Sequence, residues 1–202
     1  MAKQAKLDLY QKYSDEYVTP KQPVFVVVGP ARYLSISGQG APGGEHFREH
    51  VGALYSVAYT LKMAEKFAGH DYKVCHLEGQ WWCEDGADFR SHEPKQWRWK
   101  LLIRVPEFIT QIEVNDAIQT AIKRGKGELA NEVQLEDITE GRCVQMLHTG
   151  PYAQEKPTVD KMQQIAVENG FHLGGPHHEI YLSDPNRVPP ERLRTILRYP
   201  VE

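Results

Sequence analysis

Apolar residues spaced three and four positions apart indicate three amphipathic helices in this 202-residue chain. In the first helix, Phe47, Val51 and Leu54 begin a stripe that continues to Leu61. Each stripe stops at a glycine, the residue that most readily adopts the left-handed conformation that ends a helix. The predicted helices cover residues 47–69, 109–124 and 158–169.

Strand-like segments separate these helices. The run Val24–Val28 is continuously apolar and is broken at Gly29-Pro30, whereas Trp97–Val105 mostly alternates apolar and polar residues, as does a strand with one buried face. A Gly-rich loop, Gly38–Gly44, lies ahead of the first helix. The predicted strands cover residues 24–28, 33–37, 72–83, 97–105, 143–149, 177–183 and 194–199.

The order of the elements repeats along the chain. A strand-helix-strand-strand unit over about residues 23–106 is followed by a second unit over about 128–202, within a domain of residues 23–202. Residues 1–22 are polar and form an N-terminal arm that gains structure only by packing on this domain. We therefore predict an α+β fold, in which the duplicated units form a curved antiparallel sheet with helices on one face. A pocket between two such units is a natural ligand site.

Composition narrows the classes of function. The net charge is -3 and no basic block is present, so nucleic acid is not an expected partner. The apolar runs are too short to span a bilayer, and the N-terminus has no signal-peptide apolar region, so we expect a cytoplasmic protein without membrane contacts. The three cysteines have no Cys-x-x-Cys spacing, which argues against a disulfide framework or structural zinc. We expect no cofactor and no metal.

Several sequence motifs together resemble a known family. They are HHEIYLSDP at 177–185, LRTILRYPV at 193–201, Gly150-Pro151-Tyr152 ahead of a helix, SVAYTLK at 56–62 and LEGQWW at 77–82. This combination spans about residues 24–201 and resembles the GyrI-like (gyrase-inhibitor-like) superfamily of small-molecule-binding domains.

The resemblance implies the fold of the effector-binding half of multidrug-responsive transcription activators. It also points to a stand-alone branch with a Trp-Trp pair, whose members bind planar lipophilic or cationic compounds. Some members of that branch hydrolyse cyclopropane-bearing DNA-alkylating natural products. No DNA-binding segment is recognised in this sequence, so we do not expect direct transcriptional control.

Glu179 is the central candidate residue. Side chains alternate along a strand, which places His177 and Tyr181 on the same face as Glu179. A buried carboxylate must pair, take up a proton or meet a cationic ligand, because desolvating it alone is costly. The pattern alone favours an exposed glutamate, whereas the resemblance places the family's pocket glutamate at this position.

Aromatic residues gather near the predicted strands. Trp97 and Trp99 share one face of their strand, whereas Trp81 and Trp82 point to opposite faces. Aromatic rings stack on flat molecules and attract cations, at roughly 0.5–2 kcal/mol per cation–π contact, although a place in the core is the ordinary alternative. The predicted ligand-binding residues are Tyr55, Tyr59, Trp82, Trp97, Trp99, His177, Glu179 and Tyr181.

The segment His46-Phe47-Arg48-Glu49-His50 matches the H-x-x-E-H pattern of inverted zinc peptidases. However, Phe47 belongs to the apolar stripe, both histidines follow a Gly-rich loop, and no distal ligand helix stands out. A short motif without its structural context has a high false-positive rate. Zinc peptidase is therefore a remote third alternative.

Two functions remain open from the sequence. A binding module would sequester planar, lipophilic, often cationic drug-like molecules, with Glu179 as the counter-charge. A hydrolase would use Glu179 to draw a proton from water that attacks a strained carbon, while a tyrosine or histidine donor, for which we select Tyr152, stabilises charge on the leaving oxygen. A glutamate with a raised pKa suits either role.

Overall fold

The computed structural model describes residues 6–86, 88–125 and 127–202. Its helices are α1 Leu9–Lys12, α2 Glu45–Ala68, α3 Gln111–Lys123 and α4 Lys156–Glu168. Its strands are β1 Val24–Val28, β2 Ala31–Gln39, β3 Glu78–Trp82, β4 Arg98–Val105, β5 Gln134–Ile138, β6 Gly141–Thr149, β7 His177–Tyr181 and β8 Arg194–Pro200.

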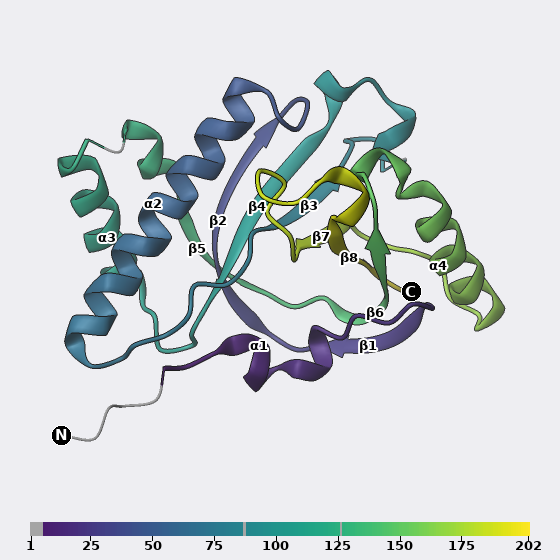
Figure 1. Ribbon diagram of the computed structural model, residues 1–202, viewed down its shortest axis with the longest axis horizontal. Helices are drawn as coiled ribbons and strands as arrows, with labels where there is room; N and C mark the ends of the chain where they lie inside the picture. The colour runs from purple at the N-terminus through teal and green to yellow at the C-terminus, as the bar shows by residue number, and fades with distance from the viewer. Residues whose placement is uncertain (1–5, 87, 126) are drawn as a thin grey trace.

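The strands form one curled antiparallel sheet in the order β1-β6-β8-β7-β3-β4-β2-β5. Helices α2 and α3 lie toward one end of the sheet and α4 toward the other, with β7 and β3 between them (Figure 1). The predicted α+β class and the curved antiparallel sheet are confirmed. The three long helices also fall where the apolar stripes predict them.

Helices α2 and α4 cover the same face of the sheet. Strand register places Leu101 and Leu197 on the face of Glu179, because Glu179 pairs with Leu197 and with Gly79, which in turn pairs with Leu101. Leu101 packs in the core beneath α2, and Leu197 packs against Val159 of α4. We call this the helix face. It carries two separate cores with the β3–β7 seam between them.

Each half of the chain supplies an edge strand to the other half. Strand β1 pairs with β6, and β5 pairs with β2. The sequence analysis missed β5, because an edge strand of composition QLEDI has little apolar character. The strand predicted over 72–83 is limited to β3, since the preceding segment is held by the N-terminal arm through a bridge between Leu7 and Tyr72.

The face opposite the helices carries a buried ionic network. His178 on β7 lies between two carboxylates, with its Nε2 3.0 Å from Glu78 Oε2 and its Nδ1 2.8 Å from Glu140 Oε1. The Arg198 Nη1 donates to the second Glu140 oxygen at 2.7 Å, and another Arg198 nitrogen donates to the backbone carbonyl of Glu16 in the N-terminal arm. The arm therefore completes this network from outside the sheet.

Trp99 fills the space between β4 and α2. Its side chain is fully buried and contacts the rings of Phe47 and His50 edge-on. Gly38, opposite Trp99 in the β2–β4 ladder, leaves room for the indole, because a Cβ at Gly38 would lie 2.2 Å from a Trp99 ring carbon. The close approach requires glycine at position 38.

Substituting Gly38 with alanine should destabilise the protein by about 1–3 kcal/mol, because a rigid, enclosed indole cannot move away from the added methyl group. The measurement is the free energy of unfolding in urea. Gly52→Ala is the matched control, since no atom lies within 4 Å of a Cβ at that helical position, and alanine there should stabilise α2 by about 0.5–1 kcal/mol. Equal effects of the two substitutions would contradict this packing.

Glu140 should make the protein sensitive to acid. Burial opposes ionisation of Glu140, but His178 and Arg198 outweigh burial and lower its pKa from 4.5 to about 2. A lowered pKa stabilises the folded state above pH 4.5, and this contribution is lost as the pH falls toward 2.

The Glu140→Gln variant should lose up to about 3–5 kcal/mol of stability at pH 7, because it leaves buried cations without their counter-charge. Its free energy of unfolding should then fall less between pH 4.5 and pH 3 than that of the wild type. Urea denaturation at several pH values measures both effects, with exposed Glu191→Gln as the control. Parallel pH profiles for Glu140→Gln and the wild type would refute the assignment.

Candidate active site

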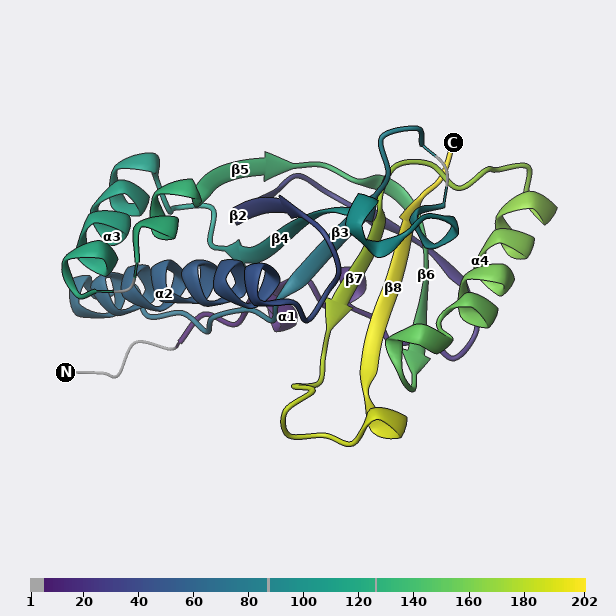
Figure 2. The same cartoon turned by 90° about the horizontal axis from the view of Figure 1, so that it is seen from above.

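The pairing of β3 with β7, which we call the β3–β7 seam, joins the two halves of the chain, and both strands lie between α2 and α4 (Figure 2). Gly79 pairs with Glu179 across this seam. The absent side chain leaves space for the Tyr181 hydroxyl, which accepts a hydrogen bond from Trp81 Nε1 at 3.1 Å. A Cβ at Gly79 would lie only 2.7 Å from that hydroxyl oxygen. The Tyr181 hydroxyl and the Trp81 indole therefore occupy the space above Gly79.

Three buried side chains meet on the helix face of this seam. His177 Nε2 lies 3.1 Å from Glu179 Oε1 and 3.4 Å from Glu155 Oε2. His177 and Glu179 come from β7, whereas Glu155 immediately precedes α4. We call these residues the acidic triad. The acidic triad therefore connects the start of α4 with strand β7 at the centre of the sheet.

The acidic triad is incompletely satisfied by hydrogen bonds. Among the described residues, both ring nitrogens of His177 and Oε1 of Glu155 are buried without a hydrogen-bond partner. The short distances between His177 and the carboxylates are therefore ionic contacts rather than well-directed hydrogen bonds. Buried polar groups in folded proteins are nearly always satisfied, so such exceptions require an explanation.

Burial and mutual charge set the ionisation of this site. Burial, reinforced by the Glu179 carboxylate, raises the pKa of Glu155 to about 7. Burial favours neutral His177, but the contacts with Glu155 and Glu179 outweigh it and raise the pKa of His177. Burial and the Glu179 carboxylate also raise the pKa of Tyr152 to about 12. Tyr152 consequently keeps its proton at neutral pH.

Aromatic rings surround the triad. The His177 ring centroid lies 4.9 Å from that of Tyr199 and 5.5 Å from that of Phe89. Tyr152 meets Tyr181 edge-on, with ring centroids 5.7 Å apart. Phe89 and Tyr199 are buried and shield the triad from solvent, whereas Tyr152 is exposed and offers a ring on which a flat molecule can stack.

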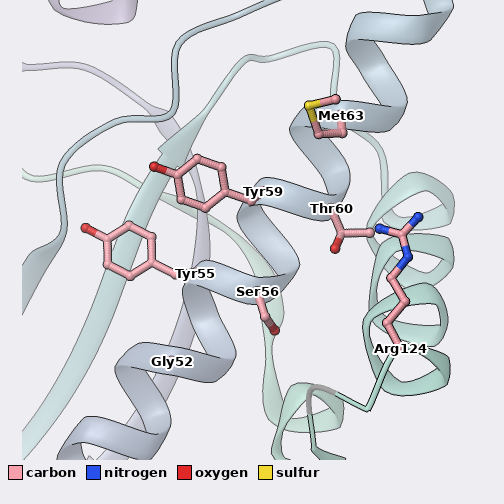
Figure 3. A pocket seen from close by; sticks show the side chains of 7 residues that line it. All are labelled: Gly52, Tyr55, Ser56, Tyr59, Thr60, Met63 and Arg124. Carbon is pink, nitrogen blue, oxygen red and sulfur yellow. The ribbon is translucent and has the colours of Figure 1, made fainter.

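A second aromatic surface runs along α2. Tyr55 and Tyr59 stack with ring centroids 6.0 Å apart, and with Met63 they line an open hollow of about 440 Å³ (Figure 3). Arg124, which follows α3, lies on the opposite side of α2 from the two tyrosine rings in Figure 3 and completes the lining. The sequence analysis selected both tyrosines, and the hollow gives them a common surface.

The structure groups the sequence-predicted residues unevenly. His177, Glu179 and Tyr181 share the helix face, as strand alternation predicts, and Tyr152 contacts Tyr181. Trp97 is half-buried, and its ring centroid lies 4.9 Å from that of Phe89. Trp97 therefore packs against one of the rings that surround the triad. Tyr55 and Tyr59 belong to the hollow on α2 described above.

Two predicted ligand-binding tryptophans do not share the site of Glu179. Trp99 is enclosed in the core beneath α2, which is the ordinary alternative that the sequence left open. Trp82 follows Trp81 on β3, so alternation places Trp82 on the face opposite the helices. Trp81, whose indole donates to Tyr181, takes the position that the sequence analysis assigned to Trp82.

Sequence reasoning missed Glu155 and Phe89. Glu155 lies three residues after the Gly150-Pro151-Tyr152 motif, but a single glutamate at a helix start is most simply an exposed residue near the helix dipole. Phe89 belongs to a charged loop between β3 and β4 that shows no apolar period. Only tertiary contacts with His177 bring these two residues into the site.

The histidines of the H-x-x-E-H segment lie elsewhere. His50 is buried against Trp99, and its Nδ1 lies 2.7 Å from the backbone carbonyl of His46. Across residues 6–86, 88–125 and 127–202, the one group of three His, Cys, Asp or Glu side chains with mutually close ligand atoms is the acidic triad. Within the same residues, every helix is too short or too polar to cross a bilayer.

Comparison with known proteins agrees with this architecture. The model of the GyrI-like small molecule binding domain matches residues 21–202, so the chain belongs to the GyrI-like family. The chain is thus a small-molecule-binding domain with the fold expected from the sequence motifs. The comparison with curated proteins gave no match.

Solved structures of similar proteins include three from Listeria innocua. An uncharacterized conserved protein is 35% identical with a TM-score of 0.91, and a protein described as a hydrolase is 34% identical with a TM-score of 0.89. Each alignment covers 98% of this chain and 100% of the other. The C-terminal domain of EcmrR shares only the fold, with 13% identity, a TM-score of 0.60 and coverage of 90% of this chain and 97% of that domain.

Proposed function

We propose that this protein hydrolyses planar, lipophilic small molecules at the acidic triad, with Glu179 as the general base. The observation that carries the proposal is the contact of 3.1 Å between His177 Nε2 and Glu179 Oε1 inside a buried aromatic site. A base must be held in one orientation and must keep a lone pair for the proton it accepts. Glu179 lies on the central strand β7, where its ion pair with His177 limits its movement.

The same site favours hydrolysis over simple capture of bulky organic cations. Capture of such a cation needs a carboxylate that is exposed to the ligand, whereas Glu179 and Glu155 are buried and face His177. A carboxylate that is held by a histidine is better suited to moving a proton. The similarity to Listeria innocua proteins described as hydrolases, at 33–34% identity over 98% of this chain, supports the same choice.

The proposed substrates carry a strained ring conjugated to a carbonyl group, as in cyclopropane-type alkylating compounds. Glu179 takes one proton from water while the water oxygen bonds to a ring carbon and the ring carbon–carbon bond breaks. The released electron pair moves through the conjugated system to the carbonyl oxygen, which takes a proton from Tyr152. Transfer of the proton from Glu179 back to Tyr152 restores both residues, and the net reaction adds one water molecule.

The aromatic surroundings define the expected shape of the substrate. Tyr152 and Tyr181 meet at 5.7 Å beside the triad, and Tyr55 and Tyr59 present a second stacked surface on α2. Stacking on such rings selects flat molecules without requiring a particular substituent. The proposed role in the cell is protection against reactive compounds of this shape.

One observation favours a second function, a binding module without catalysis. The hollow along α2 is open, about 440 Å³ in volume, and lined by Tyr55, Tyr59 and Met63 rather than by the triad. A lipophilic molecule held there would be sequestered without meeting Glu179. Binding without turnover in wild-type protein would select this alternative.

Replacing Glu179 with glutamine should lower kcat for a cyclopropane-type substrate by roughly 10²–10⁴, because the amide keeps the shape but cannot accept the proton. Substrate affinity should stay nearly unchanged. Product formation followed by mass spectrometry, together with fluorescence titration of the ligand, measures both quantities.

Trp82→Phe is the matched control for this experiment, because Trp82 lies on the face opposite Glu179 and should not affect turnover. Loss of affinity for cations alone in Glu179→Gln, with no turnover in the wild type, would favour the binding module. If neither turnover nor affinity changes in Glu179→Gln, Glu179 does not belong to the site.

Removing the hydroxyl group of Tyr152 should slow turnover while leaving the stacking surface in place. We expect Tyr152→Phe to lower kcat by about 10²-fold, the lower end of a general-acid contribution, with little change in KM. Steady-state kinetics on the same substrate provides the test. A rise in KM at constant kcat would show instead that Tyr152 only binds the substrate.

A further inference from the structure

We propose that the acidic triad, Glu155, His177 and Glu179, is a binding site for a divalent transition-metal ion, best matched by Zn²⁺. The three side chains offer one nitrogen and two carboxylate ligands, the donor types that zinc accepts from proteins. Their ligand atoms all lie within 4.8 Å of one another. They come from two elements, β7 and the segment that leads into α4.

The spacing of the donor atoms fits tetrahedral coordination. Zinc bonds to histidine nitrogen and carboxylate oxygen are about 2.0–2.2 Å long, so neighbouring ligand atoms in a tetrahedron lie about 3.4 Å apart. The observed separations from His177 Nε2 are 3.1 Å to Glu179 and 3.4 Å to Glu155. The ligand atoms of the two carboxylates lie within 4.8 Å of each other, which limits the movement that they would need to reach a separation of about 3.4 Å. Three protein ligands leave the fourth position for water.

Buried unsatisfied atoms lie within the triad. His177 Nε2, the nitrogen that faces both carboxylates, has no hydrogen-bond partner among the described residues, and neither has Oε1 of Glu155, the oxygen next to the Oε2 that faces His177. His177 is almost fully enclosed, so bulk water does not compensate it. In the network on the other face, Glu140 is held on both oxygens by cations, although His178 Nε2 and Glu78 Oε2 there also lack a directed hydrogen bond. Among the described residues, the triad differs in that its carboxylates have His177, and no arginine, within ion-pair distance.

Charge at the site also favours a cation. When both carboxylates are ionised, the triad carries a net negative charge whether or not His177 is protonated. Arg90 is the nearby cation that acts on Glu155, but its guanidinium is engaged by both oxygens of Asp88, at 2.9 and 3.0 Å. This neighbouring pair adds no net charge. A divalent ion would neutralise the negative charge of the triad, whereas a single proton would neutralise only part of it.

A bound ion would compete with the proposed catalysis. It would occupy the carboxylate oxygen of Glu179 that accepts the proton from water, so Zn²⁺ should inhibit the hydrolase reversibly. This consequence rests on the proposed function, whereas the binding of the metal does not. Metal binding is therefore measured first, without any substrate.

The test uses the full-length protein after treatment with a chelator. Calorimetric titration with Zn²⁺ should show one ion per chain, and Co²⁺ should give the visible absorption bands of a tetrahedral site with nitrogen and oxygen ligands. Glu155→Gln and His177→Gln should each weaken Zn²⁺ binding by more than about tenfold. His46→Gln is the control, because His46 belongs to the H-x-x-E-H segment and not to the triad.

If His177→Gln fails to fold, as judged by circular dichroism, the comparison rests on Glu155→Gln, which removes a buried charge and should fold. Absence of stoichiometric Zn²⁺ binding, or unchanged affinity in Glu155→Gln, would overturn the proposal. Loss of binding in His46→Gln would place the ion at the H-x-x-E-H segment instead. Zn²⁺ binding without inhibition of hydrolysis would support the metal site and refute the role of Glu179 as the general base.

Discussion

The pairing of β3 with β7 is the constraint on which the rest of the molecule depends. This ladder joins the two halves of the chain and places Gly79 opposite Glu179 and Trp81 opposite His177. A slip of one residue would move every side chain of β7 to the other face. His177 and Glu179 would then exchange places with His178 and Ile180, and both charged clusters would be lost. The clusters and the register therefore support each other.

Adjacent histidines on one strand consequently have opposite environments. His178 is fixed between Glu78 and Glu140 in a network that the N-terminal arm closes. His177 contacts two carboxylates on the helix face but leaves its nitrogens without directed hydrogen bonds. His178 Nε2 and Glu78 Oε2 also lack a directed hydrogen bond, but Arg198 supplies a fixed positive charge to that network. Among the described residues, no arginine lies within ion-pair distance of the carboxylates beside His177, so a ligand, a proton or an ion can complete that cluster.

Sequence periodicity was sufficient to predict the helices and strands that bury a continuous apolar face. It predicted α2, α3 and α4 and placed His177, Glu179 and Tyr181 together, because alternation along a strand is a local property. It could not find Glu155, since that carboxylate reaches His177 only through the docking of α4. It also could not choose between Trp81 and Trp82, because the choice depends on which face the helices cover. The edge strand β5 was missed because its pairing with β2 requires little apolar surface.

Because β1 and β5 each pair with a strand of the opposite half, the two halves cannot separate without breaking these strand pairs. Each repeat lacks an edge that only the other repeat supplies, and the central ladder is shared between them. Opening the seam would therefore expose strand edges and apolar surface on both sides at once. Neither half keeps all of its strand pairs without the other, since β1, β5 and the β3–β7 ladder all join the two halves.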